Sequence, residues 1–190
     1  MATINYKIIK DFFSKEELNV LQKYCYNRID FNKDYQVDPQ SFSPAWYNDP
    51  LMIALLDTKL PVVEKNSNLK LFPTYAYWRY YVFGAYLKQH TDRPSCEISV
   101  TVCIKKYDNW PLIIEKQIIE LKEGEALLYA GCDQKHGRPG IYKGNGMAQL
   151  FLHYVFISST NHVTHSSIGL NQYAHFVRFG HFSLDIVIQW

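Results

Sequence analysis

The chain has 190 residues, which fits one domain better than two. Hydrophobic residues make up 47% of it and charged residues 20%, so it has enough apolar material to bury a core and is not globally disordered. The net charge is only +2 and no basic strip is evident, so we expect no nucleic-acid partner. No apolar run is long enough to span a bilayer and no signal-peptide core opens the chain, so we expect no membrane partner.

The cysteines bear on the compartment. The four of them form no CxxC pair; they are Cys25, Cys96, Cys103 and Cys132. In a domain of this size we expect buried thiols, which favours a reducing, cytoplasmic setting.

The N-terminal part of the chain carries a clear helix signal. Ser14 and Glu17 form a capping box, in which each side chain can bond the backbone N–H of the other residue. Leu21 and Cys25 follow at helical spacing, so we predict a helix over residues 15–28.

Prolines and turn formers mark the elements that follow. Residues 29–47 are polar and rich in turn formers. Pro50 comes directly after Asn48 and Asp49 and is placed to start a second helix, and Pro61 is placed to start a further turn or short helix.

From residue 69 onward the pattern changes to short strands separated by turn signals. Aromatic and β-branched residues alternate with others along these segments, as is typical of strands. The predicted strands cover residues 75–82, 96–104, 112–114, 117–121, 126–129 and 148–157. Helices followed by many short strands favour a β sandwich or barrel with helices packed outside.

One short motif carries metal chemistry. In extended backbone, His90 and Asp92 lie on the same face of the chain, so that an imidazole nitrogen and a carboxylate can converge on one ion. Two histidines and one carboxylate with open positions is the non-haem Fe(II) arrangement. The pair alone is a weak signal, because a capped turn with an ion-paired histidine has the same sequence.

The surrounding sequence resembles the 2-oxoglutarate- and Fe(II)-dependent oxygenases, and among them the prolyl-hydroxylase-like branch. Tyr81-x-x-Gly84, followed by the His90 and Asp92 pair, resembles the branch's strand, glycine and HxD motif. Residues 124–129 (GEALLY) resemble the strand that leads to its distal histidine. The similarity covers residues 71–155.

The resemblance implies a mainly β fold, a double-stranded β-helix or jelly roll with N-terminal supporting α-helices. It also implies His136 as the third metal ligand beside His90 and Asp92, with Fe(II) as the metal and 2-oxoglutarate and O₂ as cosubstrates. The implied reaction is a dioxygenase reaction, a hydroxylation with decarboxylation of 2-oxoglutarate to succinate. His153, in the middle of the last predicted strand, is the rival third ligand.

The distal carboxylate of 2-oxoglutarate needs a cation, and a bidentate arginine suits it best. The chain departs from the family here, because residues 145–147, where the usual Arg or Lys would fall, contain no basic residue. We rank Arg138 first, since it follows His136 by two residues. The other candidates are Arg79, Lys143 and Arg93. Tyr81 is expected either to bond the cosubstrate or to be a core aromatic.

Two alternatives to the dioxygenase remain open. One is a non-catalytic jelly-roll module for metal binding or interaction, and the other is a cupin-type metalloenzyme that does not use 2-oxoglutarate. The expected substrate is a small molecule or a peptidyl side chain, because the neutral charge disfavours a polyanion.

The last part of the chain is unusually poor in charge. Residues 144–190 contain only two formal charges, Arg178 and Asp185. We predict a single domain over 1–190, with helical support in 1–68, a jelly-roll core in 69–157 and a C-terminal extension of unknown role in 158–190. An exposed apolar extension would aggregate, so we expect it to pack as extra strands or against a second subunit, in a homodimer.

Overall fold

The computed structural model describes residues 4–31 and 34–157. The predicted packing of the extension 158–190, as added strands or as a homodimer contact, lies outside the described residues. No helix in the described part is long and apolar enough to cross a membrane. All four cysteines are free thiols; three are buried and Cys132 is partly exposed.

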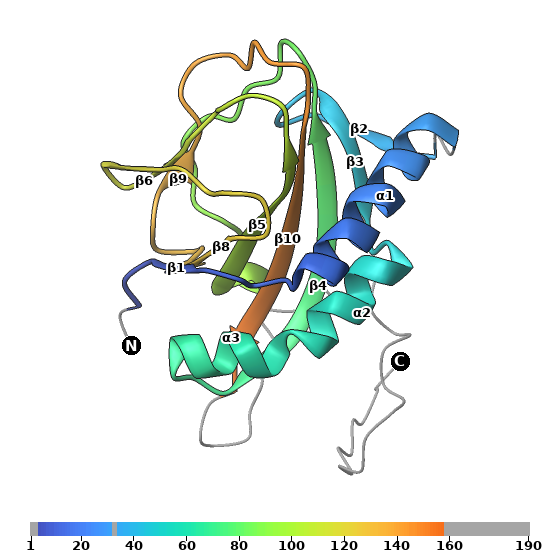
Figure 1. Cartoon of the computed structure of the whole chain (residues 1–190). Coiled ribbons are helices and arrows are strands. Elements are labelled where there is room, and N and C mark those ends of the chain that lie inside the picture. Colours follow the sequence, from blue (N-terminus) through green and yellow to red (C-terminus); the bar gives the residue numbers. More distant parts are fainter. Residues whose placement is uncertain (1–3, 32–33, 158–190) are drawn as a thin grey trace, which may run out of the picture.

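Helices and strands alternate in the first third of the chain, and strands dominate the rest (Figure 1). The helices are α1 (Lys15–Phe31), α2 (Pro50–Thr58) and α3 (Leu60–Ser67). The strands of the N-terminal part are β1 (Lys7–Ile9), β2 (Gln36–Asp38) and β3 (Ser43–Tyr47). The later strands are β4 (Leu71–Tyr81), β5 (Ile98–Lys106), β6 (Leu112–Ile114), β7 (Gln117–Ile119), β8 (Ala126–Ala130), β9 (His136–Gly137) and β10 (Met147–Phe156).

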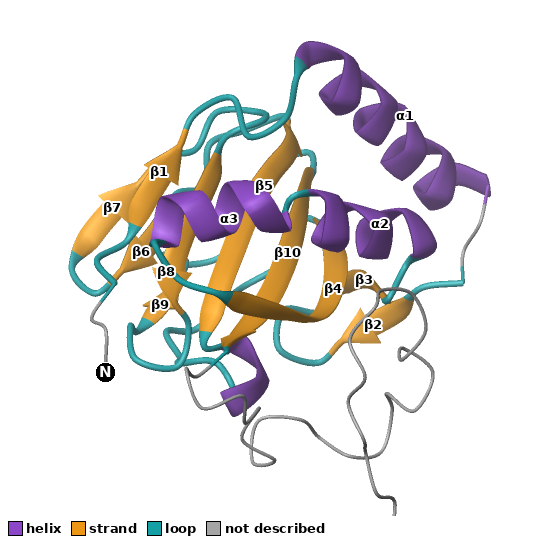
Figure 2. Ribbon diagram, turned by 90° about the horizontal axis from the view of Figure 1, so that it is seen from below, coloured by secondary structure: helices purple, strands orange, loops and turns teal. Residues whose placement is uncertain are grey.

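Two antiparallel sheets form a jelly roll. The large sheet has seven strands in the order β1-β8-β5-β10-β4-β3-β2, and the small sheet has the order β7-β6-β9. Figure 2 shows α2 and α3 lying across one face of the large sheet, over β5, β10 and β4. The predicted mainly β jelly roll with supporting helices is therefore confirmed.

The alternation along β10 divides the core into two sides. Ala148, Leu150 and Leu152 pack with the helices in the main hydrophobic cluster. Gln149 and His153 point to the opposite face of the sheet, as the period of two requires, and are also buried. The face that lines the inside of the jelly roll therefore contains polar side chains.

The segment 29–47, which is polar and rich in turn formers, contributes to the large sheet two strands that were not predicted. Trp46 on β3 is paired in register with Trp78 on β4, and their rings stack with centroids 4.0 Å apart. These strands escaped prediction because β2 has only three residues and β3 contains Pro44, which is tolerated near a sheet edge. Residues 1–68 thus supply β1, β2 and β3 as well as the helices.

Several predicted strand ends shift by two residues. Strand β5 begins at Ile98 rather than Cys96, because Pro94 starts a short 3₁₀ turn that ends at Cys96. Strand β7 ends at Ile119, two residues before the predicted end. These shifts leave the alternation of inward and outward side chains unchanged.

Candidate metal centre and cationic pocket

His90, Asp92 and His136 converge at one end of the jelly roll. The backbones of His90 and His136 pair through two N–H···O bonds of 2.9 Å, and the Asp92 N–H donates to the Gly131 carbonyl at 2.8 Å. The Asp92 Oδ1 atom lies 3.7 Å from His90 Nε2 and 3.4 Å from His136 Nε2. The ligand atoms of all three residues lie within 4.8 Å of one another.

Both histidines are held in the same tautomer. His90 Nδ1 lies 2.8 Å from the Lys88 carbonyl oxygen, and His136 Nδ1 lies 2.9 Å from the Gln134 carbonyl oxygen. A carbonyl only accepts, so each Nδ1 carries the hydrogen and donates it. Each Nε2 therefore presents a free lone pair toward Asp92, the arrangement in which neutral histidine binds a metal. Burial lowers the pKa of His90, which favours that neutral form.

A hydrogen-bond relay fixes the other side of the Asp92 carboxylate. Ser99 Oγ donates to Asp92 Oδ2 at 2.8 Å, and His153 Nδ1 lies 3.0 Å from Ser99 Oγ. The serine has one hydroxyl hydrogen and gives it to the carboxylate, so His153 Nδ1 donates to Ser99 Oγ. Burial opposes the charge of Asp92 and the hydrogen bond from Ser99 Oγ favours it, and the pKa of Asp92 is lowered overall.

Gly131 leaves the room that this relay occupies. A Cβ atom at this position would lie 2.5 Å from both Asp92 Oδ2 and Ser99 Oγ and 2.4 Å from the Cys96 carbonyl oxygen. Real Cβ atoms do not approach so closely, so any side chain here would displace the carboxylate. A glycine is therefore required where the chain approaches Asp92.

We predict that Ser99→Ala weakens divalent metal binding by about 10- to 100-fold, the usual cost of losing a group that orients a ligand. The fold is expected to survive, because only one hydroxyl is removed from β5. Titration of the metal-free protein with Mn(II), followed by electron paramagnetic resonance, measures the affinity. Ser67→Ala, which removes a hydroxyl bonded at the end of α3, is the matched control and should leave the affinity unchanged. Equal affinities for Ser99→Ala and wild type would contradict the relay.

His153 lies beside this centre but groups with other residues. Its ligand atom lies within 4.8 Å of those of Asp92 and Cys96, and His90 is not part of that group. Its side chain is buried, its ring packs 4.5 Å from that of Tyr75, and its Nε2 has no hydrogen-bond partner. Burial lowers the pKa of His153 to about 4, so the ring is neutral. His136, and not His153, faces His90.

The three converging ligand atoms suit an iron ion. They are two neutral imidazole nitrogens and one carboxylate oxygen, the donor set of the facial triad of non-haem Fe(II) sites. The fixed Nε2 lone pairs and the oriented carboxylate give that set its direction before any ion is bound. The residues present thus fit Fe(II).

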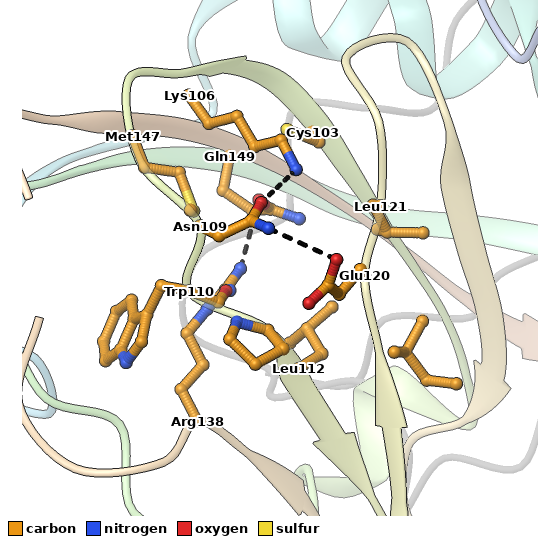
Figure 3. Close-up of a pocket in the computed structure, with 12 residues that line it drawn as sticks. Cys103, Lys106, Asn109, Trp110, Leu112, Glu120, Leu121, Arg138, Met147 and Gln149 are labelled. Atoms are coloured by element: carbon orange, nitrogen blue, oxygen red, sulfur yellow. Dashed lines mark hydrogen bonds between the residues drawn. The ribbon is translucent and has the colours of Figure 1, made fainter.

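Arg138 projects into the interior of the jelly roll two residues after His136. Its guanidinium donates to the Trp110 carbonyl oxygen and, at 3.2 Å, to Gln149 Oε1, and its Nε has no partner (Figure 3). The side chain is buried, which lowers its pKa. Within residues 4–31 and 34–157, no carboxylate lies within salt-bridge distance of it. A cavity of about 10 Å³, enough for one water, lies beside it.

Arg79 is a second buried guanidinium in the interior, but it has a counter-charge. Its Nη2 lies 2.7 Å from Asp38 Oδ2 and its Nη1 donates to the Tyr81 hydroxyl at 3.0 Å. Burial opposes its charge, but Tyr81, Tyr77 and Asp38 outweigh burial and raise its pKa. Arg79 therefore has a carboxylate partner, whereas Arg138 has none among the described residues.

The other predicted anchors lie elsewhere. Tyr81 is fully buried, as expected of a core aromatic, and its hydroxyl accepts a hydrogen bond from Arg79. Lys143 is exposed in the loop before β10. Arg93 donates from Nε to the Tyr75 hydroxyl at 3.2 Å and lies 4.6 Å over that ring. The structure thus brings Arg138, Arg79 and Tyr81 together and places the two remaining cations apart from them.

Three residues of this region escaped prediction: Asp38, Ser99 and Gln149. A polar residue within an apolar strand was a usable signal for Ser99 and Gln149, which line the inner face of β5 and β10. No comparable signal marked Asp38, which lies in the polar segment 29–47.

The fold, a jelly roll with helices packed on one face of the large sheet, is shared with solved 2OG-Fe(II) oxygenases. No family model and no curated protein matches the sequence. Solved structures do, among them a prolyl-4-hydroxylase from Pseudomonas putida, with 13% identity over 78% of this chain and 91% of that one and a TM-score of 0.65.

Two further structures agree. The viral collagen prolyl hydroxylase of Paramecium Bursaria Chlorella virus-1 shares 15% identity over 78% of this chain and 94% of that one, with a TM-score of 0.59. EctD from S. alaskensis shares 18% identity over 86% of this chain and 76% of that one, with a TM-score of 0.65. At such identities the similarity shows the fold.

Proposed function

We propose that the protein is an Fe(II)- and 2-oxoglutarate-dependent dioxygenase that hydroxylates an unactivated carbon. The observation that carries the proposal is the convergence of His90, Asp92 and His136, with both Nε2 lone pairs fixed toward one carboxylate. When bound there, Fe(II) supplies the chemistry that couples O₂ to the oxidation of substrate and the decarboxylation of 2-oxoglutarate to succinate.

The chain's own residues have separable tasks in this proposal. The histidines and Asp92 hold the metal, and Ser99 orients Asp92 by its bond to Oδ2. Arg138 receives the distal carboxylate, because it is a buried cation without a carboxylate partner among the described residues.

The substrate is proposed to be a small molecule or a peptidyl side chain, with no nucleic-acid or membrane partner. Two of the similar structures are prolyl hydroxylases, and a third is an EctD complex with 2-oxoglutarate and the small molecule 5-hydroxyectoine. We also propose a cytoplasmic location. The chain is proposed to form one domain over residues 1–190, with the jelly-roll core in 69–157.

Binding under anaerobic conditions tests the function without a known substrate. Adding Fe(II) and then 2-oxoglutarate to the metal-free protein is expected to give the visible metal-to-ligand charge-transfer band of such complexes. On admission of air, slow formation of succinate should follow. A protein that binds Fe(II) without the band would be a cupin-type enzyme or a non-catalytic module instead.

A further inference from the structure

The described interior of the jelly roll, away from the metal centre, holds three buried charged side chains. Arg79, Arg138 and Asp38 are 1%, 7% and 5% exposed, respectively. Asp38 and Arg79 form an ion pair, so the group carries one uncompensated positive charge, on Arg138. An uncompensated buried charge is costly, which points to an anionic ligand as its partner.

Asp38 is held firmly in place. Its Oδ2 accepts a hydrogen bond of 2.6 Å from Ser41 Oγ in addition to its contact with Arg79. Its backbone carbonyl accepts from the Phe42 N–H at 2.7 Å, which closes the turn between β2 and β3. The carboxylate therefore enters the interior from the end of β2, at the edge of the large sheet.

The two arginines lie near the same tyrosine ring. Arg79 on β4 is paired in register with Gln149 on β10, and the Gln149 side chain accepts from Arg138. Their guanidinium carbons lie 5.3 Å and 5.2 Å from the centre of the Tyr81 ring. Arg79 therefore lies in the same part of the interior as Arg138, and its guanidinium is held by Asp38.

We propose that Asp38 is a specificity-determining residue that sequesters Arg79 and so limits the pocket to a ligand with a single distal carboxylate, held by Arg138. The inference rests on the proposed function. Asp38 acts through Arg79 and does not touch the ligand. With Asp38 in place, the positive charge of the pocket matches one carboxylate; without it, two cations would face the ligand.

Rescue of binding tests this role. Binding of 2-oxoglutarate and of 2-oxopentanoate, which lacks the distal carboxylate, is measured by calorimetry on the Mn(II)-loaded protein. Arg138→Met should weaken 2-oxoglutarate binding by about 100-fold and abolish its preference over 2-oxopentanoate. Adding Asp38→Asn to Arg138→Met should free Arg79 and restore at least about tenfold of the affinity together with the preference. A folded double variant with no recovery would overturn the proposal.

A second variant guards against loss of stability in Asp38→Asn. Asp38→Asn with Arg79→Met removes both charges of the pair, a change that proteins usually tolerate. Its 2-oxoglutarate affinity should stay within about threefold of wild type, because Arg138 remains. A loss as large as that of Arg138→Met would show that Arg79 itself binds the carboxylate, and the proposal would fall.

Different results would contradict the proposed function and the proposed role of Asp38. If the wild-type protein shows no 2-oxoglutarate binding and no charge-transfer band, the proposed function fails, and the role of Asp38 with it. If the wild type binds 2-oxoglutarate and Arg138→Met does not, but neither variant of Asp38 behaves as stated, only the role of Asp38 fails.

Discussion

His136→Ala is expected to reduce Fe(II) or Mn(II) affinity by more than about 100-fold, because changes outside the ligand set alone cost about 10- to 100-fold. The substitution removes the Nε2 atom that lies 3.4 Å from Asp92 Oδ1 and leaves only two of the three converging ligand atoms. The 2-oxoglutarate charge-transfer band should disappear with the metal. Metal content after dialysis and competition titration with a chelator measure the loss.

His153→Ala is the informative comparison for His136→Ala. Both substitutions remove a buried histidine near Asp92, but His153 reaches Asp92 through Ser99. His153→Ala should therefore cost no more than Ser99→Ala does. The reverse order, with His153→Ala losing the metal and His136→Ala retaining it, would make His153 the third ligand and refute the assignment.

These histidines show how much of the metal site a sequence pattern can predict. His90 and Asp92 were predictable from local geometry, because two residues of separation places their side chains on one face. His136 needed the resemblance to a family, and the local signal that favoured it over His153 was its place between Gly131 and Gly137 rather than in the middle of a strand. The position of Nε2 distinguishes the two physically: that of His136 lies 3.4 Å from Asp92 Oδ1, whereas that of His153 is buried without a partner, and only a folded backbone sets this difference.

Long strands could be predicted from sequence, whereas short ones could not. The alternation of β4, β5 and β10 is long enough to be read directly, and it predicted a strand in each of these segments. Strands β2 and β9 have three and two residues, too few to display any period. They exist because longer neighbours and turns supply their partners. The pair of Asp38 with Arg79 follows from that placement, across 41 residues of sequence, and no local pattern encodes it.

Charge compensation decides between the two buried arginines. Both were candidates from sequence, because Arg138 shares a face with His136 and Arg79 shares one with Tyr81. The structure gives Arg79 a carboxylate at 2.7 Å, whereas the acceptors that the described residues offer Arg138 are neutral, a carbonyl and an amide oxygen. A ligand carboxylate therefore gains most at Arg138, where it offsets a charge that burial has left unmatched.

Arg138→Met is accordingly expected to raise the 2-oxoglutarate concentration needed for half-saturation by about 100-fold, the loss typical when a buried charged hydrogen bond is removed. Iron binding should be unchanged, because the three ligands and their supporting bonds are intact. Succinate formation at varied 2-oxoglutarate measures the requirement, and metal titration measures the binding of iron.

Two control variants separate the position of Arg138 from net charge. Lys116→Met removes a cation from the exposed turn between β6 and β7 and should leave the requirement unchanged, so an effect of net charge alone is excluded. Arg138→Lys keeps the charge but loses the planar fork, and should fall between wild type and Arg138→Met. If Arg138→Met requires no more 2-oxoglutarate than wild type, the anchor lies elsewhere, and Arg79 becomes the residue to test, because it is the other buried cation beside Tyr81.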